Sequence, residues 1–475
     1  MGWRCVSTQG SAFGTTLGFG TSPRWGAKAM KWQAYPRYKP SGVEWLGEVP
    51  EHWRTEPLKY SADFINGMAF KPETWSTTGI PIIRIENLNG GDDFNCCESD
   101  VPPKYHVDQG DLLFGWSGNR GTSFGPFLWG RKGLHYLNQH IFKLAALKHD
   151  RAWFYWCLKA VTRTIEDEAH GIIGMVHVTR GKLGAVQIPV IAPVEQRSIA
   201  DFLDRETLML DTLVAKKRTL IERLKEKRTA LIARTVTRGL PPDAARAVGL
   251  DPYPKLKASG IDWLGDLPEH WAPKRLRFIA THITVGIVVE PSKYYEESGV
   301  PCLRSLNVQP NKLIDRDLVY ISPESHRMLS KSMVKKGDLV AVRSGQPGTT
   351  AVIDDRFDGA NCIDLIIARK PRDGNPTFIS YFLNSLPAQA QFTGGSGGAI
   401  QQHFNIATAA DLWLIEPPPS EQDAVAVFLD RETTRIDNMV AKIETAIDRL
   451  QEYRTALITA AVTGKIDVRA KTSKA

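Results

Sequence analysis

The chain has 475 residues, 42% of them hydrophobic and 24% charged, a composition typical of a folded protein of about three domains. Its net charge of +8 favours a polyanionic partner, although basic charge alone is a weak indicator of nucleic-acid binding. No apolar run reaches the length of a membrane span, and six scattered cysteines without a CxxC pair argue against a disulfide framework or a structural zinc site and favour a reduced, cytoplasmic protein.

The first segment, residues 1–34, differs in composition from the rest. Its stretch GSAFGTTLGFGTSP is rich in Gly, Ser and Thr and shows neither helical nor strand periodicity, which predicts a disordered extension. It lacks the basic start and apolar core of a secretory signal. The alternative is that translation starts at Met30, in which case residues 1–29 are not translated.

A nine-residue phrase occurs twice, as WLGEVPEHW at 45–53 and WLGDLPEHW at 263–271. Further matches follow in the same order: GDLLFGWSGNRGT and GDLVAVRSGQPGT, then FLDRET twice, then RTALI twice. The chain therefore consists of two copies of one unit of about 220 residues, a period far longer than solenoid repeats. This duplication predicts a molecule with pseudo-twofold symmetry.

Each copy begins with a mixed domain. Short apolar runs at 81–85, 111–114 and 141–144 read as strands between turn residues, and 151–161 reads as a buried helix. The fold class is therefore α/β (mixed α+β). The two domains are predicted at 35–193 and 253–418.

Each copy ends in a long helix, predicted at 194–240 and 419–463, with a linker at 241–252 and a tail at 464–475. Apolar residues recur at heptad spacing, which predicts a coiled-coil seam. The seam residues are Leu203, Leu210, Leu224, Leu231, Leu429, Ile436, Ile443, Leu450 and Leu457.

Gly239 and Gly464 mark the helix ends. Each helix spans roughly 60 Å at 1.5 Å per residue. We expect the two helices to pair antiparallel within the chain, with the domains at opposite ends. Pairing of each helix with a second chain is the alternative.

Catalytic signatures are missing from the sequence. It contains no GxxxxGK[ST] loop, no [DN]PP[YF] stretch and no HExxH, and GGSGGA at 394–399 lacks GxGxxG spacing. His135 and His140 have no carboxylate or cysteine at ligand spacing, so they do not predict a metal site. Asp111 and Asp338 each follow a glycine, a position that more often shapes a turn than catalyses a reaction. We expect no cofactor or metal on this chain.

Several phrases together resemble the specificity subunit of type I restriction–modification systems. They are SGVEWLGEVPEHW, the GDLL…SG strand and loop, PVEQRSIADFLDRET and LKEKRTALIARTVTRG, and the resemblance runs from about Tyr35 to Asp467. It implies two target-recognition domains separated by two helices, each domain reading one half of a bipartite, asymmetric double-stranded DNA target. It also implies a non-catalytic scaffold for two modification subunits, which methylate adenine with S-adenosylmethionine, and for motor-nuclease restriction subunits, which use ATP and Mg.

Base reading needs Arg, Lys, Asn or Gln on loops. The candidates are Arg84, Asn87, Asn119, Arg120, Arg304, Asn307, Arg343, Gln346, Gln401 and Gln402. Residues shared by both copies, such as Arg84 with Arg304, are more typical of structural or phosphate contacts, because the two domains read different sequences. Positions that differ, Asn119-Arg120 against Gln346-Pro347, are the stronger predictions.

Two features stay open at this level. The basic stretch 216–228 is either a solvated face with Glu–Lys pairs or a surface for phosphates or a partner. Trp45 and Trp53 either fasten the domain to its helix or anchor a partner. The alternative functions are a self-contained DNA methyltransferase or nuclease, and a coiled-coil interaction protein without a DNA role.

Overall fold

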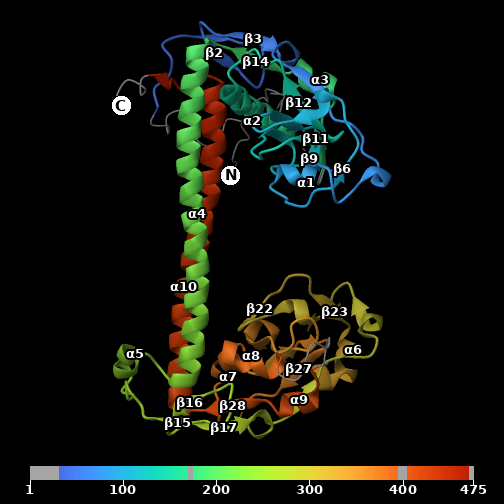
Figure 1. The fold of residues 1–475 in the computed structure, drawn as a ribbon. Helices are drawn as coiled ribbons and strands as arrows, with labels where there is room; N and C mark the ends of the chain where they lie inside the picture. The colour runs from blue at the N-terminus through green and yellow to red at the C-terminus, as the bar shows by residue number, and fades with distance from the viewer. Residues whose placement is uncertain (1–31, 169–174, 372, 394–403, 470–475) are drawn as a thin grey trace, which may run out of the picture. The chain divides into compact units, whose positions relative to one another are not determined.

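A computed structural model of the chain describes residues 32–168, 175–371, 373–393 and 404–469. The candidates Gln401 and Gln402 and nearly all of the predicted extension lie outside these ranges. The chain divides into two compact units (Figure 1). Unit 1 comprises the residues up to Lys216 and those from Ala446 onward, and unit 2 comprises Lys217–Thr445. Each unit therefore contains one globular domain and one end of each long helix.

The domain of unit 1 is built on two four-stranded sheets. The first is antiparallel, in the order β10-β8-β12-β4. The second has the order β6-β5-β11-β7 and pairs β5 with β11 in parallel. The strands of the first sheet are β4 (Asp63–Asn66), β8 (Leu112–Gly115), β10 (Gly125–Leu128) and β12 (Ile141–Ala145), and those of the second are β5 (Ile80–Ile83), β6 (Cys96–Cys97), β7 (His106–Val107) and β11 (His135–Leu137).

Strand β8 lies between two hydrophobic cores, which explains why it is apolar at every position. Leu112 and Phe114 point to the core that includes Trp153 of α2, while Leu113 points to the core that includes Ile83 of β5. Successive side chains alternate between the faces of a strand, so a strand covered on both sides must be apolar throughout. The helices of this domain are α1 (Ile85–Leu88), α2 (Arg151–Glu168) and α3 (Arg180–Ala185).

Three two-stranded ribbons complete unit 1, and they pair β1 with β2, β3 with β14, and β9 with β13. Their strands are β1 (Tyr38–Pro40), β2 (Glu48–Pro50), β3 (Arg54–Pro57), β9 (Ser117–Asn119), β13 (Met175–His177) and β14 (Gln187–Val190).

Unit 2 repeats this plan, which confirms the predicted duplication and the mixed fold class. Its antiparallel sheet has the order β18-β27-β24-β25, and its second sheet, β19-β23-β20-β26, pairs β20 with β26 in parallel. The strands are β15 (Leu256–Ala258), β16 (Asp266–Pro268), β17 (Ala272–Arg275), β18 (Ile283–Val285), β19 (Tyr295–Glu296), β20 (Val300–Leu303), β21 (Val308–Gln309), β22 (Lys312–Leu313), β23 (Val319–Ile321), β24 (Leu339–Val342), β25 (Thr350–Val352), β26 (Asn361–Cys362), β27 (Leu365–Ala368) and β28 (Trp413–Glu416).

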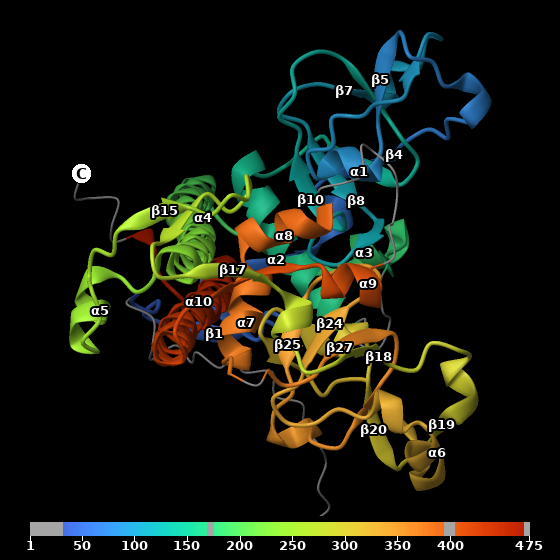
Figure 2. The ribbon, with the colours of Figure 1, turned by 90° about the horizontal axis from the view of Figure 1, so that it is seen from below.

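The helices of unit 2 differ more than its strands. Two short helices take the place of α2, and the first of them, α7, packs beside β25 (Figure 2). The short helices are α5 (Pro242–Ala247), α6 (Pro323–Met328), α7 (Pro376–Leu383), α8 (Leu386–Thr393) and α9 (Ile406–Ala410).

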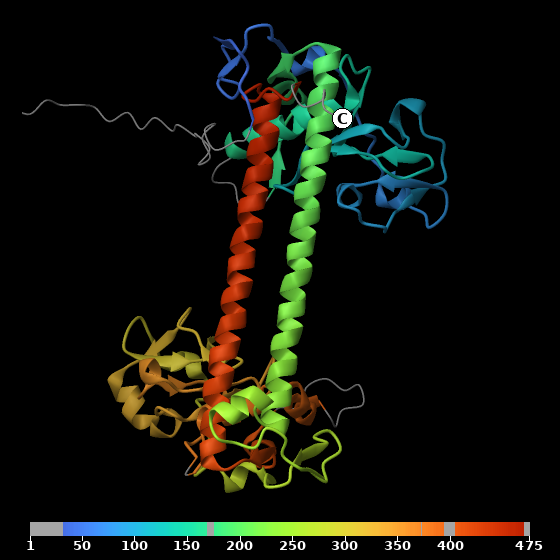
Figure 3. The ribbon, with the colours of Figure 1, turned by 90° about the vertical axis from the view of Figure 1, so that its left-hand side faces the viewer.

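The long helices are α4 (Pro193–Arg238, 46 residues) and α10 (Pro419–Val462, 44 residues). Within each unit their segments lie side by side and run in opposite directions (Figures 1 and 3). In unit 1 the Arg454 guanidinium binds Asp211 at 2.9 Å, and in unit 2 Arg228 binds Asp437 at 3.0 Å. The repeat aligns Arg228 with Arg454 and Asp211 with Asp437, so one interhelical ion pair occurs twice.

The predicted seam residues face the partner helix or the domain cores. Leu203, Leu210, Leu429, Ile436 and Leu457 are buried, whereas Leu224, Leu231, Ile443 and Leu450 are half-buried. The fully buried ones lie toward the domains, where the helices also contact sheets and loops. Among the helices in the described ranges, none has the length and apolar character needed to cross a bilayer.

The packed structure extends past three predicted boundaries. Trp32, inside the predicted extension, packs edge-on against Phe202 with ring centroids 4.7 Å apart. In the predicted tail, Ile466 and Val468 are buried in the core of unit 1. The predicted linker contains α5, whose Ala245 is buried. In all three segments apolar side chains account for the additional packed residues, because burying apolar surface stabilises a short segment against the rest of the unit.

Candidate functional site

The repeated phrase fastens each domain to the start of a long helix. Trp53 and Trp271, its last residues, are buried at 0% and 1% exposure within the two main cores. Trp45 is half-buried, and its indole Nε1 donates to the Gln187 carbonyl at 3.0 Å. Trp53 therefore packs inside unit 1 rather than being exposed for a partner, as the first of the two interpretations held.

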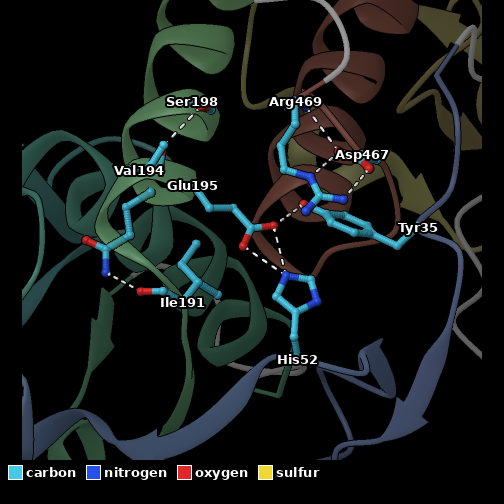
Figure 4. A network of polar contacts seen from close by, with 9 residues as sticks. Tyr35, His52, Ile191, Val194, Glu195, Ser198, Asp467 and Arg469 are labelled. Carbon is cyan, nitrogen blue, oxygen red and sulfur yellow. Dashed lines mark hydrogen bonds and ion pairs between the residues drawn. The ribbon is translucent and has the colours of Figure 1, made fainter.

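In unit 1 this junction centres on Glu195, in the first turn of α4 (Figure 4). Its carboxylate accepts hydrogen bonds from the Tyr35 hydroxyl at 2.7 Å and the His52 Nε2 at 3.0 Å. The Arg469 guanidinium lies 4.7 Å from the centroid of the Tyr35 ring and is paired with Asp467. Burial, reinforced by the hydrogen bond to Glu195, raises the pKa of Tyr35. An acidic residue is favourable here because the helix N-terminus carries positive partial charge.

The next residue of each helix makes a second, duplicated link. The Gln196 Oε1 accepts from the Asp150 backbone N–H at 2.7 Å, and its Nε2 donates to the carbonyl five residues upstream at 2.9 Å. The Gln422 side chain makes the same two bonds, to the Asn375 N–H at 2.9 Å and to an upstream carbonyl at 2.8 Å. The Glu-Gln pair that opens each helix therefore connects it to the domain in both units.

Two of the DNA candidates are buried and bonded within the fold. Asn87 and Asn307 are 2% and 0% exposed. In each, Oδ1 accepts from the backbone N–H of the preceding arginine, Arg84 or Arg304, at 2.9 Å, and Nδ2 donates to two backbone carbonyls. Because the amide is buried with both ends bonded, neither side chain is available to a ligand in this conformation.

The shared arginines are half-buried and already have partners. Arg84 forms an ion pair with Glu86 and lies 5.1 Å from the centroid of the Trp75 ring. Arg304 donates from Nη2 to the Asp317 carbonyl. Both arginines therefore have intramolecular partners beside the turn that holds the buried asparagine.

Three of the candidates that differ between copies, Asn119, Arg120 and Gln346, are exposed, whereas Arg343 is half-buried like the shared arginines. Asn119 lies on β9 with its side chain in solvent, and Gln346 is exposed on the loop after β24. Arg120 is exposed but donates to the Glu166 carbonyl at the end of α2. Arg343 is 19% exposed, and its Nη1 binds Asp364 at 2.6 Å.

The reading of residue types missed a cluster around Trp116. This residue directly follows β8, as Arg343 directly follows β24. Its indole Nε1 donates to the Asn66 Oδ1 at 3.0 Å and to the Gln139 carbonyl at 3.1 Å, and its ring contacts His140 and His177. The signal was present in the repeat, since GDLLFGW aligned with GDLVAVR places a tryptophan opposite an arginine.

The basic stretch of α4 contains both paired and exposed cations. Lys225 pairs with Glu222 at 3.0 Å within the helix, as on an ordinary solvated face, whereas Arg228 pairs with Asp437 of α10. Lys216, Arg218 and Arg223 are exposed. The described residues contain no group of three or more His, Cys, Asp or Glu side chains that could hold a metal ion.

Comparison with known proteins gives a consistent result. A family model described as "Type I restriction modification DNA specificity domain" matches residues 50–223. The specificity subunit of the type I restriction enzyme EcoBI from Escherichia coli is 22% identical over 438 residues, covering 89% of this chain and 88% of that protein. The StySPI specificity subunit from Salmonella potsdam is 26% identical over 218 residues, covering 44% of this chain and 46% of that protein.

Among solved structures, one chain from a study of complex assembly and conformational transition of the type I R-M system matches with a TM-score of 0.61. Its identity is 16%, and the match covers 88% of this chain and 99% of that chain, so it supports the fold. The family model and the length of the curated matches do not favour a self-contained enzyme or a bare coiled-coil protein. Over most of its length, the chain is similar to the specificity subunits of type I restriction–modification systems.

Proposed function

We propose that this DNA-recognition subunit binds a bipartite, asymmetric target, with each globular domain reading one half. The observation that carries the proposal is the duplication: both units contain an equivalent antiparallel sheet, a second sheet with one parallel strand pair, a histidine–glutamate contact at the helix junction and the same interhelical ion pair. Two equivalent readers in one chain require two half-sites, as in other duplicated or dimeric DNA-binding proteins. The net charge of +8 suits a phosphate-lined partner.

The proposed partners supply the catalysis. The chain docks two modification subunits, which hold S-adenosylmethionine and methylate adenine, and restriction subunits, which use ATP and Mg, and the assembly acts in the cytoplasm. Exposed apolar side chains on the long helices support docking: Leu208 and Met209 are 69% and 59% exposed in unit 1, and Val427 is 67% exposed in unit 2. Such residues are typical of surfaces that a partner covers.

We further propose that the long helices set the unread gap between the half-sites. The direct test inserts one heptad into α4 and a matching heptad into α10, which keeps the seam in phase. Seven residues add about 10 Å of helix, so the gap should lengthen by at most about three base pairs. An unchanged gap in an assembled, active complex would refute this role for the helices.

The test of the function itself is a methylome. The chain is expressed with the modification subunits of its own system in a host without other adenine methyltransferases, and methylated sites are read by sequencing. We expect a motif of two short specified blocks with a fixed unspecified gap, which disappears when the chain is omitted. Methyl transfer by the purified chain alone would contradict a non-catalytic subunit, and DNA affinity that does not fall with salt would contradict a DNA reader.

A further inference from the structure

Resting on the proposed function, the repeat identifies equivalent corners in the two domains. In unit 1 the corner is the Trp116 cluster, where the ends of β4, β8, β11 and β13 meet. The Trp116 ring lies 4.9 Å from the His177 ring and 5.3 Å from the His140 ring by centroids. His140, His177 and Asn66 are exposed. Among the hydrogen-bond and ring partners of Trp116 in the described ranges, none is a lysine or arginine.

In unit 2 the same corner holds an arginine and an aspartate. The Arg343 Nε donates to the Phe404 carbonyl at 3.1 Å, and its Nη1 binds the Asp364 carboxylate at 2.6 Å. Asp364 has a positive φ of 50°, in the left-handed region, on the loop between β26 and β27. That carboxylate is 46% exposed, so the pair lies at the surface.

The frame around the two corners is the same. Gly67 follows β4 and Gly286 follows β18. The backbone of each glycine lies against the loop that carries His140 in unit 1 or Asp364 in unit 2. A Cβ there would meet the Asn138 carbonyl oxygen at 2.0 Å or the Cys362 carbonyl oxygen at 2.4 Å, so only glycine fits. The framework is therefore shared while the exposed chemistry differs, which is the pattern expected of residues that read two different half-sites.

We propose that this corner determines base specificity in each domain, and that Arg343 reads a guanine in the half-site of unit 2. The Arg343 Nη2 has no hydrogen bond within the described ranges, so the outer edge of the guanidinium is open to the N7 and O6 acceptors of guanine. Its bonds to Asp364 and Phe404 hold the fork in one orientation, which lowers the entropy lost on binding. The Trp116 corner reads a different base through its amide and imidazole groups.

The experiment uses the full complex and duplexes in which each specified base pair of the wild-type motif is changed singly. Arg343→Ala should lower discrimination at one guanine of one block, by about tenfold to a hundredfold, and leave the other block unchanged. Asp364→Asn, which keeps the arginine, should reduce the same discrimination less. His177→Ala with Asn66→Ala should change discrimination only in the opposite block.

The matched control is Arg316→Ala, an arginine with 83% exposed side chain in the same unit but outside the corner, for which the motif should not change. An even loss of affinity on all sequences by Arg343→Ala would overturn the inference, because it would identify a phosphate contact. So would loss of discrimination in both blocks. If the wild-type complex shows no split motif at all, the proposed function fails instead, which keeps the two failures distinct.

Discussion

In both units a glutamate in the first turn of a long helix accepts a hydrogen bond from a histidine of the repeated phrase. The two units differ in the residue that supplies the second hydrogen bond to this glutamate. In unit 1 the second side-chain donor to Glu195 is the Tyr35 hydroxyl, and the Trp53 Nε1 is buried with no hydrogen-bond partner among the described residues. In unit 2 the Trp271 Nε1 donates to Glu421 at 2.5 Å. A carboxylate withdrawn from solvent needs donors, and either ring can supply one, so the requirement is for the donor rather than for a particular residue.

The path of the chain explains the exchange. Tyr253 occupies the repeat position of Tyr35, yet it is 70% exposed and stacks on Arg246. In unit 2 the segment that leaves α4 packs Leu240 and Ala245 near Trp271, and a small cavity beside Glu421 remains between them. In unit 1 the residues before the repeated phrase instead meet the segment after α10, where the Asp467 N–H donates to the Gln33 carbonyl at 2.7 Å.

The largest difference in stability between the two units is expected from substitutions of the two helix-terminal glycines. Gly464 and Gly239 both have positive φ, 71° and 83°, so alanine strains either backbone. Only at Gly464 would the new Cβ also clash, at 2.4 Å from the Pro50 Cδ, against 3.7 Å from Trp271 at Gly239. Gly464→Ala should cost about 4 kcal/mol and Gly239→Ala about 1 kcal/mol of unfolding free energy. Hydrogen exchange of each unit measures this, and equal costs would contradict the difference.

The next comparison removes one hydroxyl from each repeat tyrosine. Tyr35→Phe deletes a buried bond to a carboxylate and should destabilise unit 1 by about 1.5–3 kcal/mol. Tyr253→Phe, its matched control, should change unit 2 by less than about 0.5 kcal/mol, because that ring is exposed. Denaturant unfolding followed by unit-specific exchange gives both values. A cost for Tyr253→Phe as large as that for Tyr35→Phe would mean that Tyr253 also reaches its glutamate in solution.

A smaller difference is expected between the two buried tryptophans. Trp271→Phe and Trp53→Phe remove similar volume, but only the first breaks a hydrogen bond to a carboxylate. Trp271→Phe should therefore cost about 1–2 kcal/mol more. The same unfolding measurement applies, and a greater cost for Trp53→Phe would show that its indole N–H has a partner in solution.

The smallest effect is a pH dependence confined to unit 1. Burial, with help from the charge of Arg454, lowers the pKa of Lys159 to about 8, whereas unit 2 has the neutral Asn384 at the equivalent position. Since the folded state binds fewer protons than the unfolded state between about pH 8 and 10.5, this lysine adds stability as the pH rises through that window. Lys159→Met should raise the melting temperature of unit 1 by a few degrees at pH 7.

That gain should shrink as the pH approaches 10.5, and Asn384→Met serves as the control without a titrating group. If the gain in melting temperature for Lys159→Met did not change with pH, the charge of the buried Lys159 would not destabilise unit 1 at neutral pH.

The sequence predicted what depends on regular spacing. Heptad spacing placed the seam, including Leu203 and Leu429, and the aligned phrases predicted the duplicated sheets and helices. It did not predict the Glu195 junction, because Tyr35, His52 and Asp467 approach one another from distant parts of the chain.

The candidate site was predicted in part. Residue type selected Asn87, which the fold buries, and passed over Trp116, whose aromatic side chain suggests a core. Arg343 was selected, but its partner Asp364 lies in another loop that only the folded sheet brings near. Which polar residues remain exposed is a property of the packing rather than of residue type.

The central claim is that one chain carries two interchangeable readers. It is tested most directly by replacing residues 266–416 with a second copy of residues 48–190 and reading the methylome of the assembled complex. We expect a motif in which the half-site of the copied domain occurs twice and the other half-site is lost. A motif that keeps both original half-sites would contradict it.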